Sequence, residues 1–156
     1  MDKINLQKYK NTESVIILPY VEDKVLMQLR DEKKSIIFPG KWGFFGGGIN
    51  EKESPEDAAR RELFEELDIK PKSLNKFFYD NIPELAGHMS HAFCCPLSVP
   101  IQNIKLYEGM DLGLFSIEQV NSGKLYSSRF NKFYPVMKIP HILNTLRALF
   151  IYINQN

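Results

Sequence analysis

The sequence predicts an α/β fold, for which α+β is an equally acceptable label, with helices on both faces of a mixed β-sheet. Two apolar, β-branched segments at 14–21 and 24–30 are separated only by the polar pair Glu22 and Asp23, which is typical of an antiparallel hairpin. A helix start lies near Ser54, and apolar residues at three- and four-residue spacing close the chain. Because strands and helices alternate irregularly after the hairpin, a doubly wound parallel sheet is not expected.

The length and composition indicate one globular domain. The chain has 156 residues, of which 44% are hydrophobic and 25% charged, which suffices for one core but not for two. We find no internal repeat or linker, so residues 1–156 are predicted to form a single domain. The 20 Lys and Arg against 19 Asp and Glu leave a net charge of +1, which provides no global attraction toward nucleic acid or an anionic membrane.

The cysteines and the N-terminus predict a reduced, cytoplasmic protein. Cys94 and Cys95 are adjacent in a predicted strand, so their side chains point to opposite faces and a bridge between them would be strained. Residues 1–5 lack the apolar core of a signal peptide, and no apolar run is long enough to span a membrane. We expect free thiols and no membrane contact, and we leave a homodimer open.

The remaining elements follow from local patterns. Residues 31–42 are polar and contain a Pro-Gly pair, so they are predicted to form a loop. Ser54 is a suitable N-cap, with Pro55 at the first helical position, for a helix that runs to about Leu67. The other predicted elements are strands at 43–49, 75–80, 87–97 and 112–116, a short helix at 117–120, and an amphipathic helix at 140–153.

One face of the helix at 55–67 is acidic. At about 100° per residue, Glu62, Glu65 and Glu66 fall within about 100° of arc. Carboxylates at this spacing repel one another unless a cation neutralises them, and hard oxygen ligands suit Mg²⁺ or Mn²⁺. Arg61 precedes Glu65 by four residues and is predicted to orient it, which leaves other carboxylate oxygens for the metal. Taken alone, such an acidic run is most often a solvated helix face.

A glycine loop precedes this helix. Gly46, Gly47 and Gly48 carry no side chains, so their backbone amides and carbonyls can approach a ligand closely. A carbonyl near Gly46 or Gly47 is a suitable neutral oxygen ligand for the metal. The position of these glycines beside an acidic helix predicts metal-assisted phosphate chemistry and weakens the interpretation as a solvated face.

The glycines and the acidic helix together resemble the Nudix box. Its pattern is Gly, five residues, Glu, seven residues, Arg-Glu, an aliphatic residue, any residue, Glu-Glu, any residue, Gly and a final aliphatic residue. The matching positions are Gly47, Glu53, Arg61, Glu62, Leu63, Glu65, Glu66 and Ile69. Asp68 departs from the second glycine, where a left-handed residue is usually needed, but Asp tolerates that conformation better than most residues. Phe45, where many members have proline, removes no ligand.

The resemblance to the Nudix (MutT-like) hydrolase family implies a fold and a metal site. The fold is an α/β/α sandwich, on which the box forms a loop, a helix and a second loop. By position, Glu62, Glu65 and Glu66 become metal ligands together with a carbonyl of Gly46 or Gly47. The implied cofactor is magnesium (Mg²⁺) or manganese (Mn²⁺).

The same resemblance indicates catalytic candidates. These are Glu53, Glu65 and Glu66 of the box. The general base is left open between Glu53 or Glu66 and an acid outside the box, Glu108 or Asp111. For the last two residues, an ordinary polar turn is an equal alternative.

Two sets of polar side chains remain. The first contains cations before the box that bind a terminal phosphate or only serve solubility: Arg30, Lys33, Lys34 and Lys41. The second contains histidines without metal-ligand spacing, which we interpret as ordinary polar residues: His88, His91 and His141.

The function that the resemblance implies is Mg²⁺-dependent hydrolysis of the pyrophosphate bond in a nucleoside diphosphate linked to another moiety. The implied partner is a small nucleotide substrate, either a nucleoside triphosphate or a sugar nucleotide. An alternative is a non-catalytic Nudix domain that binds a nucleotide as a sensor or regulator, although such domains usually have broken box glutamates. Action on RNA ends usually requires a basic surface, which a net charge of +1 does not indicate. An unrelated protein with an acidic helix would bind no divalent ion.

Overall fold

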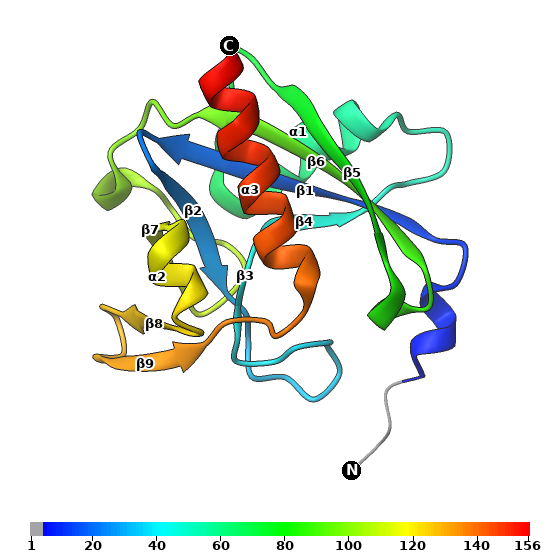
Figure 1. The fold of residues 1–156 in the computed structure, drawn as a ribbon, viewed down its shortest axis with the longest axis horizontal. Helices are drawn as coiled ribbons and strands as arrows, with labels where there is room; N and C mark the ends of the chain where they lie inside the picture. Colours follow the sequence, from blue (N-terminus) through cyan, green and yellow to red (C-terminus); the bar gives the residue numbers. More distant parts are fainter. Residues whose placement is uncertain (1–4) are drawn as a thin grey trace.

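A mixed β-sheet with helices on both faces forms the framework of the protein (Figure 1). The computed structural model describes residues 5–156. The prediction that the N-terminus is no signal peptide falls mainly on residues 1–4, which lie outside the described range. Helix α1 (Pro55–Leu67) packs on one face of the sheet and α3 (Pro140–Gln155) packs on the other. The predicted fold class, an α/β sandwich with a mixed sheet, is confirmed.

Strand β1 occupies the centre of this sheet. The strands are β1 (Glu13–Val21), β2 (Lys24–Leu29), β3 (Trp42–Gly43), β4 (Phe45–Gly48), β5 (Asn75–Ile82), β6 (His88–Pro96) and β7 (Asp111–Ser116). Strand β1 pairs antiparallel with β2 and β4 and parallel with β6, while β7 pairs antiparallel with β2. The antiparallel pair β5–β6 completes the opposite edge. The predicted opening hairpin β1–β2 is therefore present. On its other side, β1 pairs in parallel with β6.

The two faces of the sheet bury separate cores, because alternate residues of a strand point to opposite sides. Cys94 belongs to the core under α3, and Cys95 belongs to the core under α1. Both thiols are free and buried. Burial raises the pKa of Cys94 to about 12 and that of Cys95 to about 11. The prediction that these thiols face opposite sides without a bridge is confirmed.

The predicted strand at 43–49 is wrong as a single element. Trp42 and Gly43 pair with β2, whereas Phe45 to Gly48 pair with β1. The chain therefore changes partners at Phe44 and leaves two short strands, β3 and β4. Pattern alone does not show this, because the residues on both sides of the break are equally apolar or small.

A second hairpin lies where no element was predicted. Helix α2 (Ile117–Asn121) leads into β8 (Lys124–Ser127) and β9 (Lys132–Pro135), which form their own antiparallel pair. Both strands are short and partly polar, so they carry a weak strand signal. The hairpin is attached to the core by Trp42, whose Nε1 donates to the carbonyl of Leu125 at 3.0 Å. Three short 3₁₀ segments complete the described chain: Leu6–Tyr9, Pro83–Leu85 and Ile101–Asn103.

Helix α1 has the ends that the sequence predicts. The Ser54 hydroxyl accepts a hydrogen bond from the Asp57 amide at 3.1 Å, and Pro55 occupies the first turn. At the other end Asp68 adopts a left-handed conformation with φ 55° and ψ 35°, and its amide donates to the carbonyl of Phe64. The departure from glycine at this box position is thus accommodated by the backbone.

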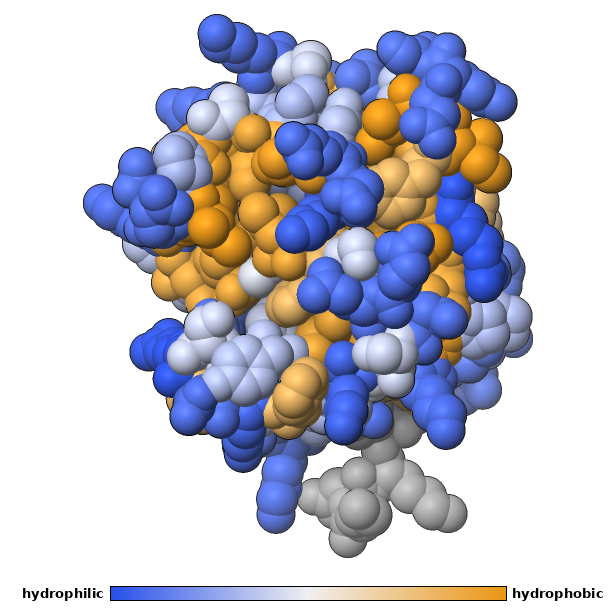
Figure 2. Space-filling model, turned by 60° about the vertical axis from the view of Figure 1, so that its left-hand side comes forward, coloured by the Kyte–Doolittle hydropathy of each residue, from blue (hydrophilic) through white to orange (hydrophobic). Residues whose placement is uncertain are grey.

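The surface is mainly polar. On the face turned forward in Figure 2, apolar residues reach the surface in patches that hydrophilic side chains separate. Within residues 5–156 no helix is long and apolar enough to cross a membrane.

Asp68→Gly is expected to raise the free energy of unfolding by about 1 kcal/mol, because glycine adopts a positive φ without strain and the change removes a negative charge from a helix C-terminus. Urea denaturation would measure this. Asp68→Asn, which removes only the charge, should gain less. An Asp68→Gly variant no more stable than wild type would show that the left-handed position carries no strain.

Candidate active site

The acidic helix and the glycine strand meet through Glu66. This side chain is buried, with 2% of its surface exposed, and its Oε2 accepts a hydrogen bond from the Gly46 amide at 3.0 Å. Strand β4 holds Gly46 in place because it pairs with β1, in the register Gly46 opposite Ile16. Apolar residues of α1 pack on the same side of the sheet: Ala58, Ala59, Leu63 and Leu67. The helix is therefore anchored by its apolar stripe while Glu66 reaches the glycines.

Two of the three glycines have no room for a side chain. A Cβ on Gly46 would lie 2.1 Å from the Val15 carbonyl oxygen, and its φ of +154° favours glycine. A Cβ on Gly47 would lie 2.3 Å from Oε1 of Glu62. A Cβ on Gly48 would meet nothing within 4 Å. Glycine is thus needed at Gly46 because β4 packs closely against the backbone of β1, and at Gly47 because the Glu62 carboxylate lies close to the backbone.

Arg61 binds the loop and the helix together. Its Nε and Nη2 donate to the two carboxylate oxygens of Glu53 at 2.8 and 2.9 Å, and Nη2 also donates to the Gly48 carbonyl at 2.9 Å. Its Nη1 donates to Glu62 at 2.8 Å and to Glu65 at 3.3 Å. The predicted contact with Glu65 is present, and the contacts with Glu53 and Glu62 are shorter. Arg61 therefore orients the carboxylates of this cluster from one side.

The contact with Arg61 keeps the Glu53 side chain in its ionised form. Hydrogen bonds from Arg61 and from the Asn50 amide lower the pKa of Glu53 to about 2. Both of its oxygens already accept bonds, so its geometry suits a clamp between loop and helix better than proton transfer.

Glu66 has the opposite electrostatic environment. Burial raises its pKa to about 9, and the neighbouring carboxyls of Glu108 and Glu62 add to the shift. Burial also raises the pKa of Glu62, although the hydrogen bond from Arg61 opposes this. Arg30 faces the same group, since Glu108 and Glu66 support its positive charge against the effect of burial. Full ionisation of these carboxyls would therefore place more negative charge in the cluster than Arg30 and Arg61 balance.

The donor chemistry fits a hard divalent cation. Crowded carboxylates that resist ionisation become ionised when such a cation is bound, and oxygen-rich sets favour Mg²⁺ or Mn²⁺. The side chains are not gathered tightly around one point: among residues 5–156 no group of three His, Cys, Asp or Glu side chains is placed to hold an ion. Glu65 is the most open, with 56% of its side chain exposed. Glu62 and Glu66 are therefore the box residues that lie nearest the glycine loop.

The comparison with family models identifies this arrangement. The model of the NUDIX domain matches residues 10–134. The chain belongs to the NUDIX family. It is 30% identical over 106 residues to the oxidized purine nucleoside triphosphate hydrolase of Mus musculus, covering 68% of this chain and 54% of the mouse protein. It is 49% identical over 53 residues to the RNA pyrophosphohydrolase of Bartonella bacilliformis, covering 31% of each chain. The chain thus spans about half, or less, of the length of these relatives.

Solved NUDIX structures share the fold. The MutT protein from Methanosarcina mazei Go1 aligns with a TM-score of 0.64 and 23% identity, covering 93% of this chain and 96% of that one. The E. coli dihydroneopterin triphosphate pyrophosphohydrolase aligns with a TM-score of 0.65 and 18% identity, covering 92% and 98%. At such identities the likeness shows the sandwich and not the substrate.

Glu108 is the candidate outside the NUDIX box that the structure brings to the cluster. Its loop is fixed by three hydrogen bonds to backbone carbonyls. The side-chain Nε2 of Gln28 donates to the Glu108 carbonyl at 3.0 Å. The Tyr107 amide donates to the Glu66 carbonyl at 2.9 Å, and the Met110 amide donates to the Leu29 carbonyl at 2.8 Å. Gln28 is buried and was not identified from the sequence, because nothing in a strand pattern marks one glutamine as a loop anchor.

Asp111 is not brought to this cluster. Its Oδ2 accepts from the Ser127 hydroxyl at 2.6 Å and from the Arg129 amide, and its Oδ1 accepts from the Leu112 amide. These contacts tie β7 to the β8–β9 hairpin. Asp111 therefore joins structural elements, whereas Glu108 lies beside Glu66 and Arg30.

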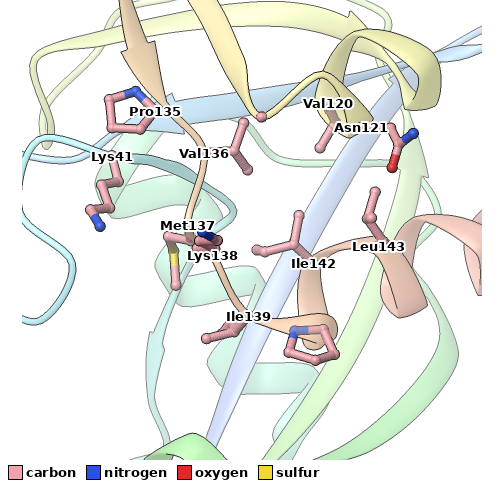
Figure 3. A pocket seen from close by; sticks show the side chains of 12 residues that line it. Lys41, Val120, Asn121, Pro135, Val136, Met137, Lys138, Ile139, Ile142 and Leu143 are labelled. Carbon is pink, nitrogen blue, oxygen red and sulfur yellow. The ribbon is translucent and has the colours of Figure 1, made fainter.

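The cations before the NUDIX box separate into two places. Arg30 lines a cavity of about 330 Å³ together with Lys33, Glu65 and Glu108, close to the acidic cluster. Lys41 instead lines a different cavity of about 490 Å³, shown in Figure 3 among the apolar side chains of Val136, Ile139 and Ile142. Of the two phosphate-binding candidates, the structure places only Arg30 beside the carboxylates. Lys34 is exposed.

The three glycines are expected to respond differently to alanine. Gly46→Ala should lower the free energy of unfolding by at least about 2 kcal/mol, because its Cβ meets backbone at a strained φ. Gly47→Ala should remain folded but weaken Mn²⁺ binding, because its Cβ displaces the Glu62 carboxylate. Gly48→Ala serves as the matched control and should change neither urea denaturation nor calorimetric Mn²⁺ titration. Equal behaviour of Gly47→Ala and Gly48→Ala would contradict the role assigned to Glu62.

Arg61→Lys is expected to weaken Mn²⁺ affinity by about 10- to 100-fold, because an ammonium group cannot hold Glu53 and Glu62 simultaneously. Calorimetric titration would measure the loss. The control is Arg60→Lys on the same helix, where the guanidinium contacts Glu56 and the Pro71 carbonyl. If both variants bound Mn²⁺ as wild type does, Arg61 would not position the carboxylates.

Proposed function

We propose that this protein hydrolyses the pyrophosphate bond of a nucleoside diphosphate linked to another group, most naturally a nucleoside triphosphate, with Mg²⁺ or Mn²⁺ as cofactor. The observation that carries this proposal is the carboxylate cluster beside the backbone of Gly46 and Gly47, which is formed by buried Glu66, half-buried Glu62 and exposed Glu108. A bound cation would favour ionisation of these crowded carboxyls, and the adjoining cavities can accept the phosphates. Membership in the NUDIX family supports the same reaction class.

The metal would be held by Glu62 and Glu66, with Glu65 turning inward from its exposed position and a carbonyl of Gly46 or Gly47 as a neutral ligand. Such an ion neutralises charge that develops on the phosphoryl oxygens and lowers the pKa of a water molecule. Arg61 keeps the carboxylates oriented. Arg30, charged and half enclosed between the two cavities, stabilises the negative charge of the phosphate chain.

We assign the general base to Glu108. Glu53 is saturated by Arg61 and Asn50, and Glu66 already accepts a hydrogen bond from Gly46. The Glu108 loop is held through its backbone, and its exposed carboxylate lies beside Glu66, where it can take a proton from the attacking water. The products would be a nucleoside monophosphate and pyrophosphate or a second phosphorylated fragment.

The names of the relatives suggest the substrate class. The mouse relative, which aligns over the longer stretch, is named for oxidized purine nucleoside triphosphates, and the Bartonella relative for RNA. A net charge of +1 provides little attraction for an RNA backbone. We therefore favour a free nucleotide over an RNA end, and a cytoplasmic location would suit that substrate.

Glu66→Gln is expected to abolish Mg²⁺-dependent release of pyrophosphate from nucleoside triphosphates, with a fall of about 100-fold or more, since losing one ligand removes several kcal/mol of charge stabilisation. Mg²⁺ at 100 times its Kd should stabilise wild type by about 2.7 kcal/mol but leave the variant unchanged. Glu118→Gln, an exposed substitution on α2, is the control.

The same assay separates the catalytic domain from a sensor. Glu108→Gln should keep the stabilisation by Mg²⁺ while losing turnover, as expected for a base that is not a ligand. Wild-type protein that binds nucleotide but hydrolyses nothing across nucleoside triphosphates and sugar nucleotides would show that the chain is a non-catalytic nucleotide-binding domain.

A further inference from the structure

The charged side chains of this protein are unevenly distributed along the chain. All 19 acidic residues occur before residue 119, whereas five of the 20 Lys and Arg residues follow it. The five are Lys124, Arg129, Lys132, Lys138 and Arg147. The net charge of +1 therefore conceals a basic C-terminal part and an acidic remainder. A surface on which the two parts meet can be complementary to a copy of itself.

The outward side of the β8–β9 hairpin is aromatic and basic. Leu125 and Tyr134 are buried in the core under α3. Because strand residues alternate, their neighbours Tyr126 and Phe133 point outward. These two rings meet edge to face at 5.3 Å, and the residues are 41% and 56% exposed. Lys124 Nζ lies 4.9 Å from the centre of the Phe133 ring. We call the exposed residues Lys124, Tyr126, Lys132 and Phe133 the hairpin face.

An acidic groove of about 740 Å³ lies between the β1–β2 turn, α2 and the last turns of α3. Three carboxylates line it, those of Glu22, Asp23 and Glu118, against one guanidinium, that of Arg147. The apolar part of its lining includes Ile151, which is 59% exposed. The other apolar residues of the lining are Ile117, Phe150 and Ile153. The groove thus combines an apolar floor with an excess of negative charge.

The charges of both regions are available to a partner. Among residues 5–156, no ion pair includes Glu22, Asp23 or Glu118, and none includes Lys124 or Lys132. An exposed ion pair contributes little to affinity by itself. The charges therefore select the partner, while the neighbouring apolar side chains provide most of the affinity.

Helix α2 connects the hairpin face to the acidic groove. It packs on β8 and on α3, and Glu118 lies in its first turn. In Figure 1, α2 lies between the β1–β2 turn and the β8–β9 hairpin. Figure 2 turns this side of the molecule forward and shows apolar side chains at the surface between charged ones. The basic and the acidic region are therefore neighbours on one face.

The pairing of these regions decides between partners. A nucleic acid or an anionic lipid surface would match the hairpin face, but the carboxylates beside it would repel such a partner. The partner must be acidic opposite the hairpin and basic opposite the groove. A second copy of this chain, rotated by 180° about an axis near α2, has this pattern.

We propose that this face binds a second copy of the chain across a two-fold axis, with the hairpin face of each copy seated in the acidic groove of the other. The lysines of the hairpin face meet the groove carboxylates, and Tyr126 and Phe133 cover Phe150 and Ile151. The groove shares no lining residue with the two cavities beside the proposed active site. Each copy therefore keeps its own site, and the inference does not depend on the proposed reaction.

Sedimentation velocity of the full chain between about 1 and 100 µM tests this proposal, since an interface of modest size associates weakly. We expect a monomer–dimer equilibrium without larger species, because a two-fold contact closes on itself. Higher salt should weaken the dimer, because the contacting charges are exposed before association. Wild-type protein that stays monomeric, or that forms species larger than a dimer, would overturn the proposal.

Two charge-reversal variants locate the interface. Lys124→Glu with Lys132→Glu makes both regions acidic, and Glu22→Lys with Glu118→Lys makes both regions basic. Each variant alone should dimerise about 100-fold more weakly than wild type, because like charges then meet at both contacts. An equimolar mixture of the two variants should restore the dimer, because each contact again joins opposite charges.

Lys70→Glu with Lys72→Glu is the matched control, because both lysines are exposed and follow α1 on the other side of the sheet. This variant should dimerise as wild type does, and all three variants should keep the wild-type melting temperature because the changed residues are exposed. Charge-reversal variants that dimerise normally would place the interface elsewhere. A mixture that stays monomeric would show that the two regions do not meet.

A labelled single-stranded oligonucleotide tests the other partner. The proposal expects no binding to the wild-type dimer beyond that of the control variant. Binding by a monomeric wild-type protein that is lost in Lys124→Glu with Lys132→Glu would assign the hairpin face to nucleic acid and overturn the dimer.

Discussion

The hydrogen bond from the Gly46 amide to the buried Glu66 carboxyl is the contact on which the site depends. It can form only because strand β4 lies against β1 without side chains at Gly46 and Gly47, and because the apolar stripe of α1 holds the helix under the sheet. The same proximity buries Glu66 beside Glu62 and Glu108, which raises its pKa to about 9. Close backbone packing thus crowds these carboxyls, and a bound divalent cation would favour their ionisation.

Arg61 and Arg30 have different electrostatic roles around this cluster. Arg61 lies on the loop side and is committed to Glu53, Glu62 and Glu65, so it organises ligands and has no donor to spare for substrate. Arg30 lies on the cavity side, where its Nε contacts the Ile37 carbonyl and burial disfavours its charge. A half-enclosed guanidinium of this kind gains most when a phosphate arrives.

The α3 face of the sheet adds a cavity of about 560 Å³ to the framework. Strand β1 contributes Ser14 to the cavity floor and pairs through its neighbouring residues with β4, so one strand connects the glycine loop to the cavity. The hydrogen-bond chain from Tyr9 through Thr12 and His88 orients the Ser14 hydroxyl. His88 and His141, which the sequence marked as ordinary polar residues, therefore line the cavity.

The sequence by itself determined the features that depend on local spacing: the fold class, the opening hairpin, the caps of α1, the left-handed Asp68, and the acidic face with Arg61. Only the tertiary structure decided which distant residues join them. Glu108 and Asp111 are three residues apart and chemically alike. A hydrogen bond from Gln28 nevertheless fixes Glu108 near Glu66, whereas a hydrogen bond from Ser127 fixes Asp111 at the second hairpin. The break at Phe44 likewise follows from strand partners far along the chain. Periodicity reports which side of an element is buried, whereas the partner of a buried polar group is set by long-range packing.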